Sequence, residues 1–346
     1  MSVRIIGFYE SLRTFLNIAE GGIPLDNSNY ALQMQDITVE FPGVLANNHV
    51  SIDCKKGEVL GLLGENGAGK TTLMNVLYGL YEPTTGKVFL DGKEVHITSP
   101  LEAIKNGIGM VHQHFKLVDT LSVIENVILG IKDDKQRLDL ESAKKRLLEL
   151  CEEYELYVDP DEVVWRLPVG KQQWVEILKA LYRDCKLLIL DEPTAVLTEK
   201  EAAALLESIR GMASRGIAVI FITHRLQEVL NVCDKVVIMR DGKVVKDTPA
   251  SETSVDEITR CMVGRSVDLS AAREVRDCSD ARTIMSIRKL WVDMPGEIVR
   301  NVNLDVKEGE ILGIGGLAGQ GKLGIPNGVM GLYEAGGTVE FDGKPI

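Results

Sequence analysis

Apolar and polar residues alternate in two neighbouring stretches near the start of the chain. The apolar positions are Leu32, Met34, Ile37, Val39 and Phe41 in a stretch that starts at about Tyr30, and Val50, Ile52 and Cys54 in the second. A period of two is typical of a strand with one buried face. Pro42-Gly43 and Lys55-Lys56-Gly57 supply turn residues after the stretches. The pattern predicts a β-rich entry to the fold.

Four apolar runs show no such alternation. They span Glu58–Leu63, Ile108–Val111, Leu187–Leu190 and Ile217–Ile222. Runs of this length predict strands that are covered on both faces, as in a parallel sheet. Asp-Gly pairs within 86–93 and 236–245 also predict two hairpin turns.

Apolar residues at helical spacing predict helices between these runs. The first helix contains Leu73, Met74, Val76, Leu77 and Leu80. A helical pattern covers about 120–157, and its part 141–157 places Leu147, Leu150, Cys151 and Tyr154 on one stripe. Further helices are predicted over 100–106, over 199–213 before Gly216, and through Val175, Ile177, Leu178 and Leu181.

A glycine-rich stretch joins the first buried run to the first helix. It reads G-x-x-x-x-G-K-T and consists of Gly64, Glu65, Asn66, Gly67, Ala68, Gly69, Lys70, Thr71 and Thr72. Glycine lets the backbone approach an anion, and the amides of the loop and of the helix start point at a phosphate chain. The motif predicts that Lys70 lies along the β- and γ-phosphates of a nucleotide and that the Thr71 hydroxyl holds Mg²⁺.

Polar residues follow the other three buried runs. Asp191 and Glu192 follow the third run, His224 follows the fourth, and Gln113 follows the second. Open α/β sheets bind ligands at the carboxyl ends of their strands, so we expect these side chains beside the nucleotide. Asp191 is expected to orient Mg²⁺, and Glu192 to polarise a water that attacks the γ-phosphate. His224 is expected to hold that water, and Gln113 to reach the water or the metal.

Composition excludes several classes of protein. The formal net charge of −12 over 346 residues argues against nonspecific nucleic-acid binding, and no apolar run is long enough for a membrane span. The segment 1–20 is better explained as a short amphipathic helix than as a signal peptide. The six cysteines form no C-x-x-C pair, and His112 with His114 lacks a third ligand, so structural metal sites and disulfides are disfavoured.

Phe41 precedes Gly64 by 23 positions, and two interpretations of it remain open. Its ring can stack on an adenine base. Packing of a strand aromatic in the core explains the same spacing equally well.

Five landmarks occur in one order along the chain: 64–71, Gln113, 167–173, 187–192 and His224. This set resembles the nucleotide-binding domain of the ABC ATPases, with its Walker A, Q-loop, signature, Walker B and H-loop. The resemblance covers about residues 30–265. It assigns to the signature, which acts on a partner domain, the residues Leu167, Pro168, Val169, Gly170, Lys171 and Gln172.

The resemblance implies an α/β fold of the P-loop NTPase class and ABC type. Such a fold has a mixed β-sheet core, an antiparallel β entry and an α-helical subdomain, here at about 115–180. ATP and Mg²⁺ are the implied ligands, with the metal near Thr71, Gln113 and Asp191 and the adenine against Phe41. Hydrolysis would involve Glu192, His224, Gln113 and Lys70.

Two departures from the family pattern matter, one in the signature and one after Walker B. Leu-Pro-Val-Gly-Lys stands where Leu-Ser-Gly-Gly-Gln is usual, so Pro168 replaces a hydroxyl and an N–H that would meet the partner's γ-phosphate. Proline is tolerated in a first helical turn, so the helix is expected to form. Thr198 stands where an aspartate is common after Walker B. Both changes weaken the expected contribution to a partner's site.

The chain contains an internal repeat. The segment 301–316 echoes the run from about 48 to 64 at a shift of 252 positions, which places Gly321-Lys322 on Gly69-Lys70. The echo of Asp91-Gly92-Lys93 comes one residue early, at Asp342-Gly343-Lys344. Leu323 replaces Thr71, so this second loop lacks the Mg²⁺ hydroxyl. We therefore expect an extension over 1–29, an ABC domain over 30–265, a linker over 266–282 and an incomplete second ABC domain over 283–346.

A tandem arrangement with a degenerate second loop resembles the ATP-binding subunits of importers for simple sugars and nucleosides, and most closely the nucleoside branch linked to basic membrane lipoproteins. This resemblance implies a peripheral location on the cytoplasmic face of the inner membrane. The implied partners are permease subunits, an extracytoplasmic solute-binding protein acting indirectly, and a second ABC domain or a second copy of the chain.

Hypotheses from other classes compete with this one. A soluble ABC protein acting on ribosomes or DNA would need a basic patch, a charged arm or zinc cysteines, which the sequence lacks. A nucleotide-binding remnant without turnover is the third hypothesis, because the repeat stops before a second signature. We therefore expect the chain to bind MgATP and to turn it over poorly unless it dimerises or meets the missing half.

Overall fold

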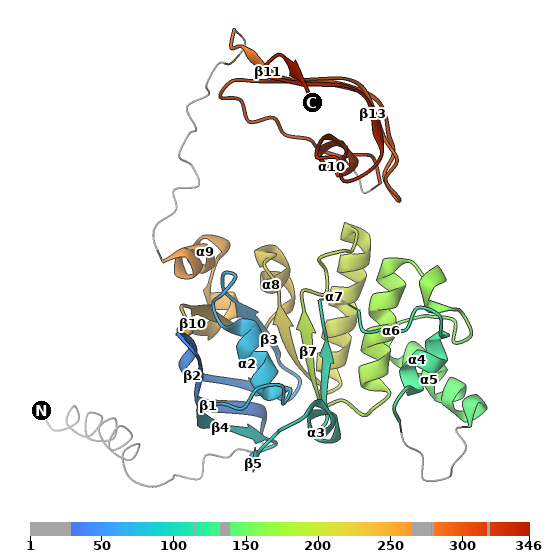
Figure 1. Ribbon diagram of the computed structural model, residues 1–346. Coiled ribbons are helices and arrows are strands. Elements are labelled where there is room, and N and C mark those ends of the chain that lie inside the picture. Colours follow the sequence, from blue (N-terminus) through green and yellow to red (C-terminus); the bar gives the residue numbers. More distant parts are fainter. Residues whose placement is uncertain (1–28, 114, 132–138, 265–277, 279, 317–318) are drawn as a thin grey trace, which may run out of the picture. The chain divides into compact units, whose positions relative to one another are not determined.

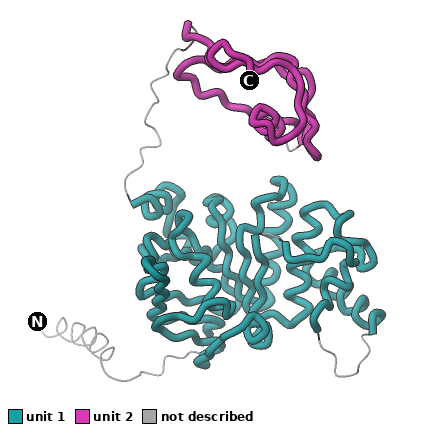
Figure 2. The backbone as a smooth tube through the Cα atoms, viewed as in Figure 1, with its two compact units in different colours: residues 1–267 teal, residues 268–346 magenta. Residues whose placement is uncertain are grey.

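The computed structural model describes residues 29–113, 115–131, 139–264, 278, 280–316 and 319–346. The chain divides into two compact units, residues 1–267 and residues 268–346 (Figure 2). All but residue 29 of the predicted extension over 1–29, and most of the predicted linker over 266–282, lie outside the described residues, and so does His114.

Unit 1 consists of two sheets and a set of helices (Figure 1). Its strands are β1 (Tyr30–Phe41), β2 (Val44–Lys55), β3 (Val59–Leu63), β4 (Thr85–Leu90), β5 (Lys93–Val95), β6 (Ile108–Val111), β7 (Leu187–Asp191), β8 (Ala218–Ile222), β9 (Lys235–Arg240) and β10 (Lys243–Pro249). Its helices are α2 (Lys70–Leu77), α3 (Pro100–Lys105), α4 (Val123–Ile128), α5 (Leu140–Tyr154), α6 (Val169–Leu181), α7 (Glu199–Ser214), α8 (Leu226–Val232) and α9 (Val255–Val263), with 3₁₀ turns at Val164–Arg166 and Ala250–Glu252.

The larger sheet has the strand order β10-β9-β3-β8-β7-β6. Neighbouring strands from β9 to β6 pair in parallel, and only β10 pairs antiparallel. Every residue of β3, β6 and β8 is buried, as the continuous apolar runs predict for strands covered on both faces. The carboxyl ends of five strands therefore meet at one edge of this sheet.

The two faces of the larger sheet border different layers of the core. Leu60 and Leu62 of β3 pack with α2 and with the antiparallel sheet β2-β1-β4-β5. Val59 and Leu63 belong to the other cluster, which contains residues of α4 to α8. Helices α4, α5 and α6 gather at one side of unit 1 (Figure 1). The antiparallel β entry and the helical region predicted from sequence are thus both present.

Some element ends differ from the prediction. Leu80 is not part of α2, which ends at Leu77; the chain turns at Gly79, whose φ is 73°, and the Leu80 side chain is 49% exposed. The helix predicted to reach Tyr157 ends at Tyr154, because Glu155 adopts a left-handed conformation with φ 58°. The described part of the helical stretch 120–157 forms two helices rather than one.

Unit 2 repeats the smaller sheet of unit 1. Its elements are β11 (Thr283–Val292), β12 (Val299–Lys307), α10 (Gly324–Val329), β13 (Ala335–Phe341) and β14 (Lys344–Pro345), and its strand order β12-β11-β13-β14 corresponds to β2-β1-β4-β5. Positive φ angles recur at the shift of 252, as in the pairs His49 and Asn301 or Gly57 and Gly309. Both units therefore share backbone turns as well as sequence.

The segment Glu310–Gly316 departs from its counterpart in unit 1. The matching residues of unit 1 form β3 and pair with β8 and β9, whereas the segment in unit 2 forms no strand and Ile311 is 83% exposed. No described strand of unit 2 pairs with this segment. An extended segment without neighbours has no ladder of hydrogen bonds to hold it as a strand.

Candidate nucleotide site

The glycine-rich loop lies between β3 and α2, as the motif requires. Gly64 and Gly69 have φ angles of 155° and 96°, and a Cβ atom at either position would collide with a backbone carbonyl oxygen, that of Met239 or that of Ala46. No side chain caps α2, and its first turn holds no acidic residue. The first amides of α2 are therefore available to an anion.

Lys70 lies over this loop. Its Nζ donates to the carbonyl oxygen of Gly64 at 2.7 Å and to that of Glu65 at 2.9 Å. Burial lowers the pKa of Lys70, while the nearby carboxylates of Glu192 and Asp191 oppose this shift. The ammonium is thus held close to the loop amides and to two carboxylates.

The carboxyl ends of β6, β7 and β8 carry the other predicted residues. Gln113 and His224 each lie two residues past the end of their strands, β6 and β8, and Asp191 ends β7 with Glu192 next to it. Because these strands are parallel neighbours, their ends lie at the same edge of the sheet as the loop after β3. Positions that are far apart in sequence are thereby brought to one place.

Glu192 and His224 form a direct contact. Nδ1 of His224 lies 2.6 Å from Oε2 of Glu192, and because a carboxylate only accepts, Nδ1 donates the hydrogen. The amide of Glu192 donates to Ile222 at 2.8 Å, and Glu192 has a left-handed φ of 52°, which is unusual for a glutamate. One hydrogen bond therefore holds the backbone of Glu192, and the other holds its carboxylate.

A single cleft of about 850 Å³ collects these groups. Its lining includes the consecutive residues 66–72 of the loop and of α2. It also includes Phe41, Gln113, Asp191, Glu192 and His224. Gly64 and Glu65 do not line it and contribute the two carbonyls that hold Lys70. The volume lies at the upper end of the usual range for ligand pockets, about 300–1,000 Å³.

Phe41 lines this cleft and also packs against the core beneath the antiparallel sheet. It is half-buried, and its ring meets the ring of Tyr81 edge to face at a centroid distance of 5.3 Å. Both interpretations from sequence therefore remain open. One face of an aromatic pair beside a phosphate loop is suited to a planar base.

The oxygen atoms of Thr71, Asp191 and Gln113 fit a hard divalent cation such as Mg²⁺. Burial raises the pKa of Asp191, and the neighbouring charge of Glu192 raises it further, against the opposing effect of Lys70. A cation bound beside Asp191 would offset both effects. Within the described residues, no group of three or more His, Cys, Asp or Glu side chains is placed to hold a metal ion.

The signature residues lie away from the cleft of their own unit. None of the six lines it, and Pro168 and Val169 are exposed at the start of α6. Pro168 is the N-cap of α6 and makes no side-chain capping bond. Gln172 donates from Nε2 to the carbonyl of Leu167 at 3.0 Å, and Nζ of Lys171 donates to the carbonyl of Tyr157 and lies over the ring of Trp174.

Sequence reasoning missed several residues of the site, among them the lining residues Val44, Leu45 and Ala46. Asn47 is buried and donates from Nδ2 to the carbonyl oxygen of Gly69 at 3.2 Å, across 22 positions. Asp241 and Gly242 line the cleft, although the sequence identified them only as a hairpin turn. Their place follows from β9, which is a parallel neighbour of β3 and so ends at the same edge. A sequence signal exists for Asp241 and Gly242 once that pairing is known, but none exists for Asn47.

Unit 2 reproduces part of the loop geometry. Nζ of Lys322 donates to the carbonyl oxygen of Gly316 at 3.0 Å, as Lys70 does to Gly64. Leu323 follows it and offers no hydroxyl. The second loop therefore retains the cation and lacks the oxygen ligand.

Residues 47–195 match the family model described as ABC transporter. The chain is 42% identical over 319 residues to the nucleoside import ATP-binding protein NupA of Lactococcus lactis subsp. cremoris, and 40% identical over 347 residues to the glucose import ATP-binding protein TsgD13 of Haloferax volcanii. Each alignment covers 91% of this chain and 63% of the relative. The chain thus spans less than two thirds of the length of these proteins.

Solved structures share the fold of unit 1. The ADP conformation of MJ1267, an ATP-binding cassette of an ABC transporter, matches with a TM-score of 0.59 and 26% identity, over 67% of this chain and 94% of that one. The ATP-binding cassette MJ0796, described as a dimer in a post-hydrolysis state with ADP and Pi, matches with a TM-score of 0.56 and 26% identity, over 63% of this chain and 98% of that one. The P-loop ABC ATPase fold predicted from sequence is confirmed. Among the described residues, no helix is long and apolar enough to cross a membrane.

Proposed function

Because the chain belongs to the ABC transporter ATP-binding proteins, we propose that it binds MgATP in the cleft at the carboxyl edge of the larger sheet and takes part in its hydrolysis. The observation that carries this proposal is the convergence of Lys70, Gln113, Asp191, Glu192 and His224 on that cleft. These residues come from separate stretches of the chain, and a structural role alone would not gather them around a phosphate loop.

Each residue has a role that its position supports. Lys70 and the amides of the loop and α2 bind the phosphate chain, and Phe41 contacts the adenine. Thr71, Asp191 and Gln113 would hold Mg²⁺, which neutralises charge on the phosphates. Glu192 accepts a proton from the attacking water, and the His224 hydrogen bond keeps that carboxylate oriented.

The signature supports a site shared between two domains. Its residues are exposed at the start of α6 and do not line the cleft of their own unit, so in this proposal they meet nucleotide bound by a second ABC domain or a second copy. The dimeric MJ0796 cassette with ADP and Pi is an example of paired cassettes. Closure around ATP and reopening after hydrolysis would then drive alternating access in permease subunits.

We further propose that the transported solute is a nucleoside or a simple sugar. The support comes from the relatives described as import proteins for nucleosides and for glucose. Permease subunits at the cytoplasmic face of the membrane, and indirectly a solute-binding protein, are the partners in this proposal. Capture of membrane partners followed by a ligand screen on the associated solute-binding protein tests it, and capture of ribosomes or nucleic acid instead would contradict it.

Glu192→Gln tests the catalytic assignment. The amide keeps an acceptor oxygen for His224 and cannot take a proton, so we expect ATP binding within a few-fold of wild type and turnover at least about 100-fold lower. Glu199→Gln, an exposed position at the start of α7, is the matched control and should leave turnover unchanged. Undiminished hydrolysis by Glu192→Gln would remove Glu192 from its assigned role.

A further inference from the structure

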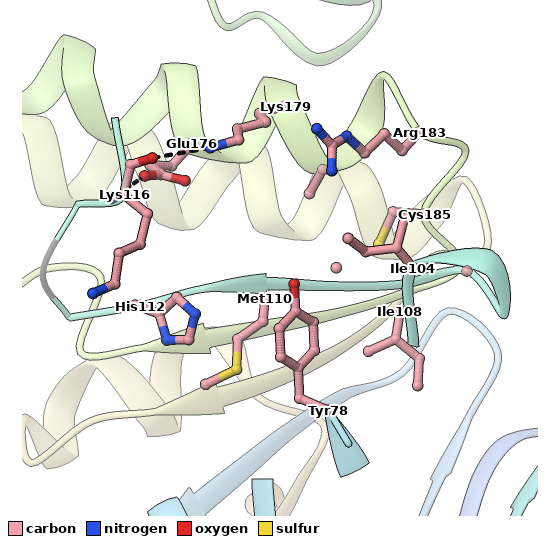
Figure 3. Close-up of a pocket in the computed structure, with 13 residues that line it drawn as sticks. Tyr78, Ile104, Ile108, Met110, His112, Lys116, Glu176, Lys179, Arg183 and Cys185 are labelled. Atoms are coloured by element: carbon pink, nitrogen blue, oxygen red, sulfur yellow. Dashed lines mark hydrogen bonds between the residues drawn. The ribbon is translucent and has the colours of Figure 1, made fainter. Parts of the chain in front are cut away.

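A second cavity in unit 1 has no part in the nucleotide cleft. It has a volume of about 250 Å³ and shares no lining residue with the cleft. It lies between β6 and α6, with Tyr78 after α2 closing it from below in the view of Figure 3. Ile104, Ile108 and Met110 form its apolar side.

The charges around this cavity are unbalanced. Lys116, Lys179 and Arg183 line it, and Glu176 is the one acidic residue among its described lining. Glu176 already accepts the backbone amide of Lys116. Within the described residues none of the three cations forms an ion pair with a carboxylate. Three cations against one carboxylate leave an excess of positive charge in the cavity, which favours an anion.

Several donors in the cavity also lack full hydrogen bonding. Nη2 of Arg183 donates to the carbonyl of Leu129 at 2.6 Å, but its buried Nε has no partner in the described structure. Nζ of Lys179 donates only to the carbonyl of Lys116, at 3.0 Å. The Tyr78 hydroxyl and the Lys116 ammonium make no hydrogen bond within the described residues. Because the unpartnered Nε of Arg183 is buried, a ligand that accepts a hydrogen bond from it would be favoured.

The side chains approach the cavity from different directions. The guanidinium of Arg183 extends from the turn just after α6, and the Tyr78 hydroxyl points toward the same space from the opposite side (Figure 3).

We propose that this cavity binds a compact anion, a phosphate or a carboxylate, through Arg183, Lys179 and Lys116 with the Tyr78 hydroxyl as an additional donor. The guanidinium can donate two parallel hydrogen bonds to either group. The cavity volume corresponds to roughly eight water molecules, at about 30 Å³ each, which is enough for inorganic phosphate or a short-chain acid.

The anion would join two functional segments. Lys116 belongs to the segment after β6 that carries Gln113, whereas Lys179 and Arg183 belong to α6 and its end, and α6 begins at the signature. A bound anion would therefore fix the segment with Gln113 against the signature helix. Anion binding in this cavity does not depend on the proposed ATPase function. Only the effect of the anion on the segment with Gln113 rests on that function.

Ligand-observed NMR titrations with inorganic phosphate, and separately with acetate, test the proposal on the full chain. Phosphate could also occupy the loop after β3, so every titration is repeated in a Lys70→Ala background. Lys116→Met removes an exposed ammonium that makes no hydrogen bond, and leaves the backbone bond to Glu176 in place. Lys145→Met, at an exposed position of α5, is the matched control.

We expect binding of at least one anion that persists in Lys70→Ala, weakens about tenfold in Lys116→Met and is unchanged in Lys145→Met. Glu176→Gln keeps the acceptor for Lys116 and removes the opposing charge, so it should tighten binding. Thermal unfolding establishes that each variant is folded. The proposal is overturned if neither anion binds, if Lys70→Ala abolishes binding, if Lys116→Met and Lys145→Met behave alike, or if only a protein segment occupies the cavity.

Discussion

Asp191 and Glu192 are adjacent carboxylates at the end of a buried strand, and this placement has a cost. The pKa of Asp191 is raised by burial first and by Glu192 second. Glu192 also has a left-handed backbone, which costs of order 1–3 kcal/mol for a residue other than glycine. Lys70 is the cation that opposes these charges, and burial lowers its own pKa. We expect such a cluster of charges, at a proposed site for nucleotide and metal, to lower the stability of the folded protein in the absence of ligands.

Asp191→Asn should stabilise the protein in the absence of nucleotide and Mg²⁺. A raised folded-state pKa means that the ionised carboxyl destabilises the folded state above that pKa, and that protonation relieves this as the pH falls. We expect a melting temperature about 2 °C above wild type at pH 8, with the difference shrinking toward zero near pH 4. Thermal unfolding of both proteins at several pH values measures this difference in melting temperature. A less stable variant at every pH would show that the charge of Asp191 is compensated.

At the scale of elements, Thr198 illustrates how the structure explains a departure from the family pattern. Thr198 is the N-cap of α7, where its side chain accepts from the amide of Glu201 and the Glu201 carboxylate accepts from the amide of Thr198. This capping box satisfies two amides at the start of the helix. Aspartate is also a good N-cap, so an aspartate at this position would be able to cap α7 as well.

Thr198→Val should lower the free energy of unfolding by about 1 kcal/mol, because valine fills a similar volume and cannot cap. Thr198→Asp should stay within about 0.5 kcal/mol of wild type. Denaturant unfolding of both variants checks this pair. Equal losses in both would mean that packing, and not the cap, is the contribution of Thr198.

Pro168→Ser at the start of α6 should change stability little. A serine N-cap adds about 1 kcal/mol, whereas the loss of proline frees the unfolded chain and costs about 0.4–1 kcal/mol. The variant restores a hydroxyl and an N–H in the signature, so we expect ATP turnover to rise at protein concentrations that favour pairing. If ATP turnover is the same in wild type and Pro168→Ser at all protein concentrations, this would argue against a shared site that uses this signature.

Element types were largely predictable, because apolar periodicity reports burial on one face or on two. Element ends were less so. Glu155 takes a left-handed turn that its residue type does not signal, whereas Gly79 was an available stop signal that the apolar spacing through Leu80 overrode. The strand-end residues of the cleft followed from the parallel arrangement. Asn47 did not, because its bond to Gly69 is a tertiary contact with no local pattern.

At the scale of the whole molecule, the chain contains one unit with a nucleotide cleft and a second that repeats the antiparallel sheet and part of the loop. The repeat extends to backbone turns and to the Lys322 contact with Gly316, while Leu323 removes a metal ligand. In the proposed function the two loops are therefore unequal. Nucleotide is expected at the loop of unit 1, with the loop of unit 2 at most weakly occupied.

The central claim is that the cleft of unit 1 binds MgATP through Lys70. Lys70→Ala removes the cation that lies over the loop, and Lys322→Ala makes the same change in unit 2 and serves as its control. Calorimetric titration of MgATP into the wild type and both variants measures the affinity and the stoichiometry of binding. The account predicts about one nucleotide per chain, at least tenfold weaker binding in Lys70→Ala, and little change in Lys322→Ala. Equal affinity of the wild type and Lys70→Ala, or no binding by the wild type, would contradict it.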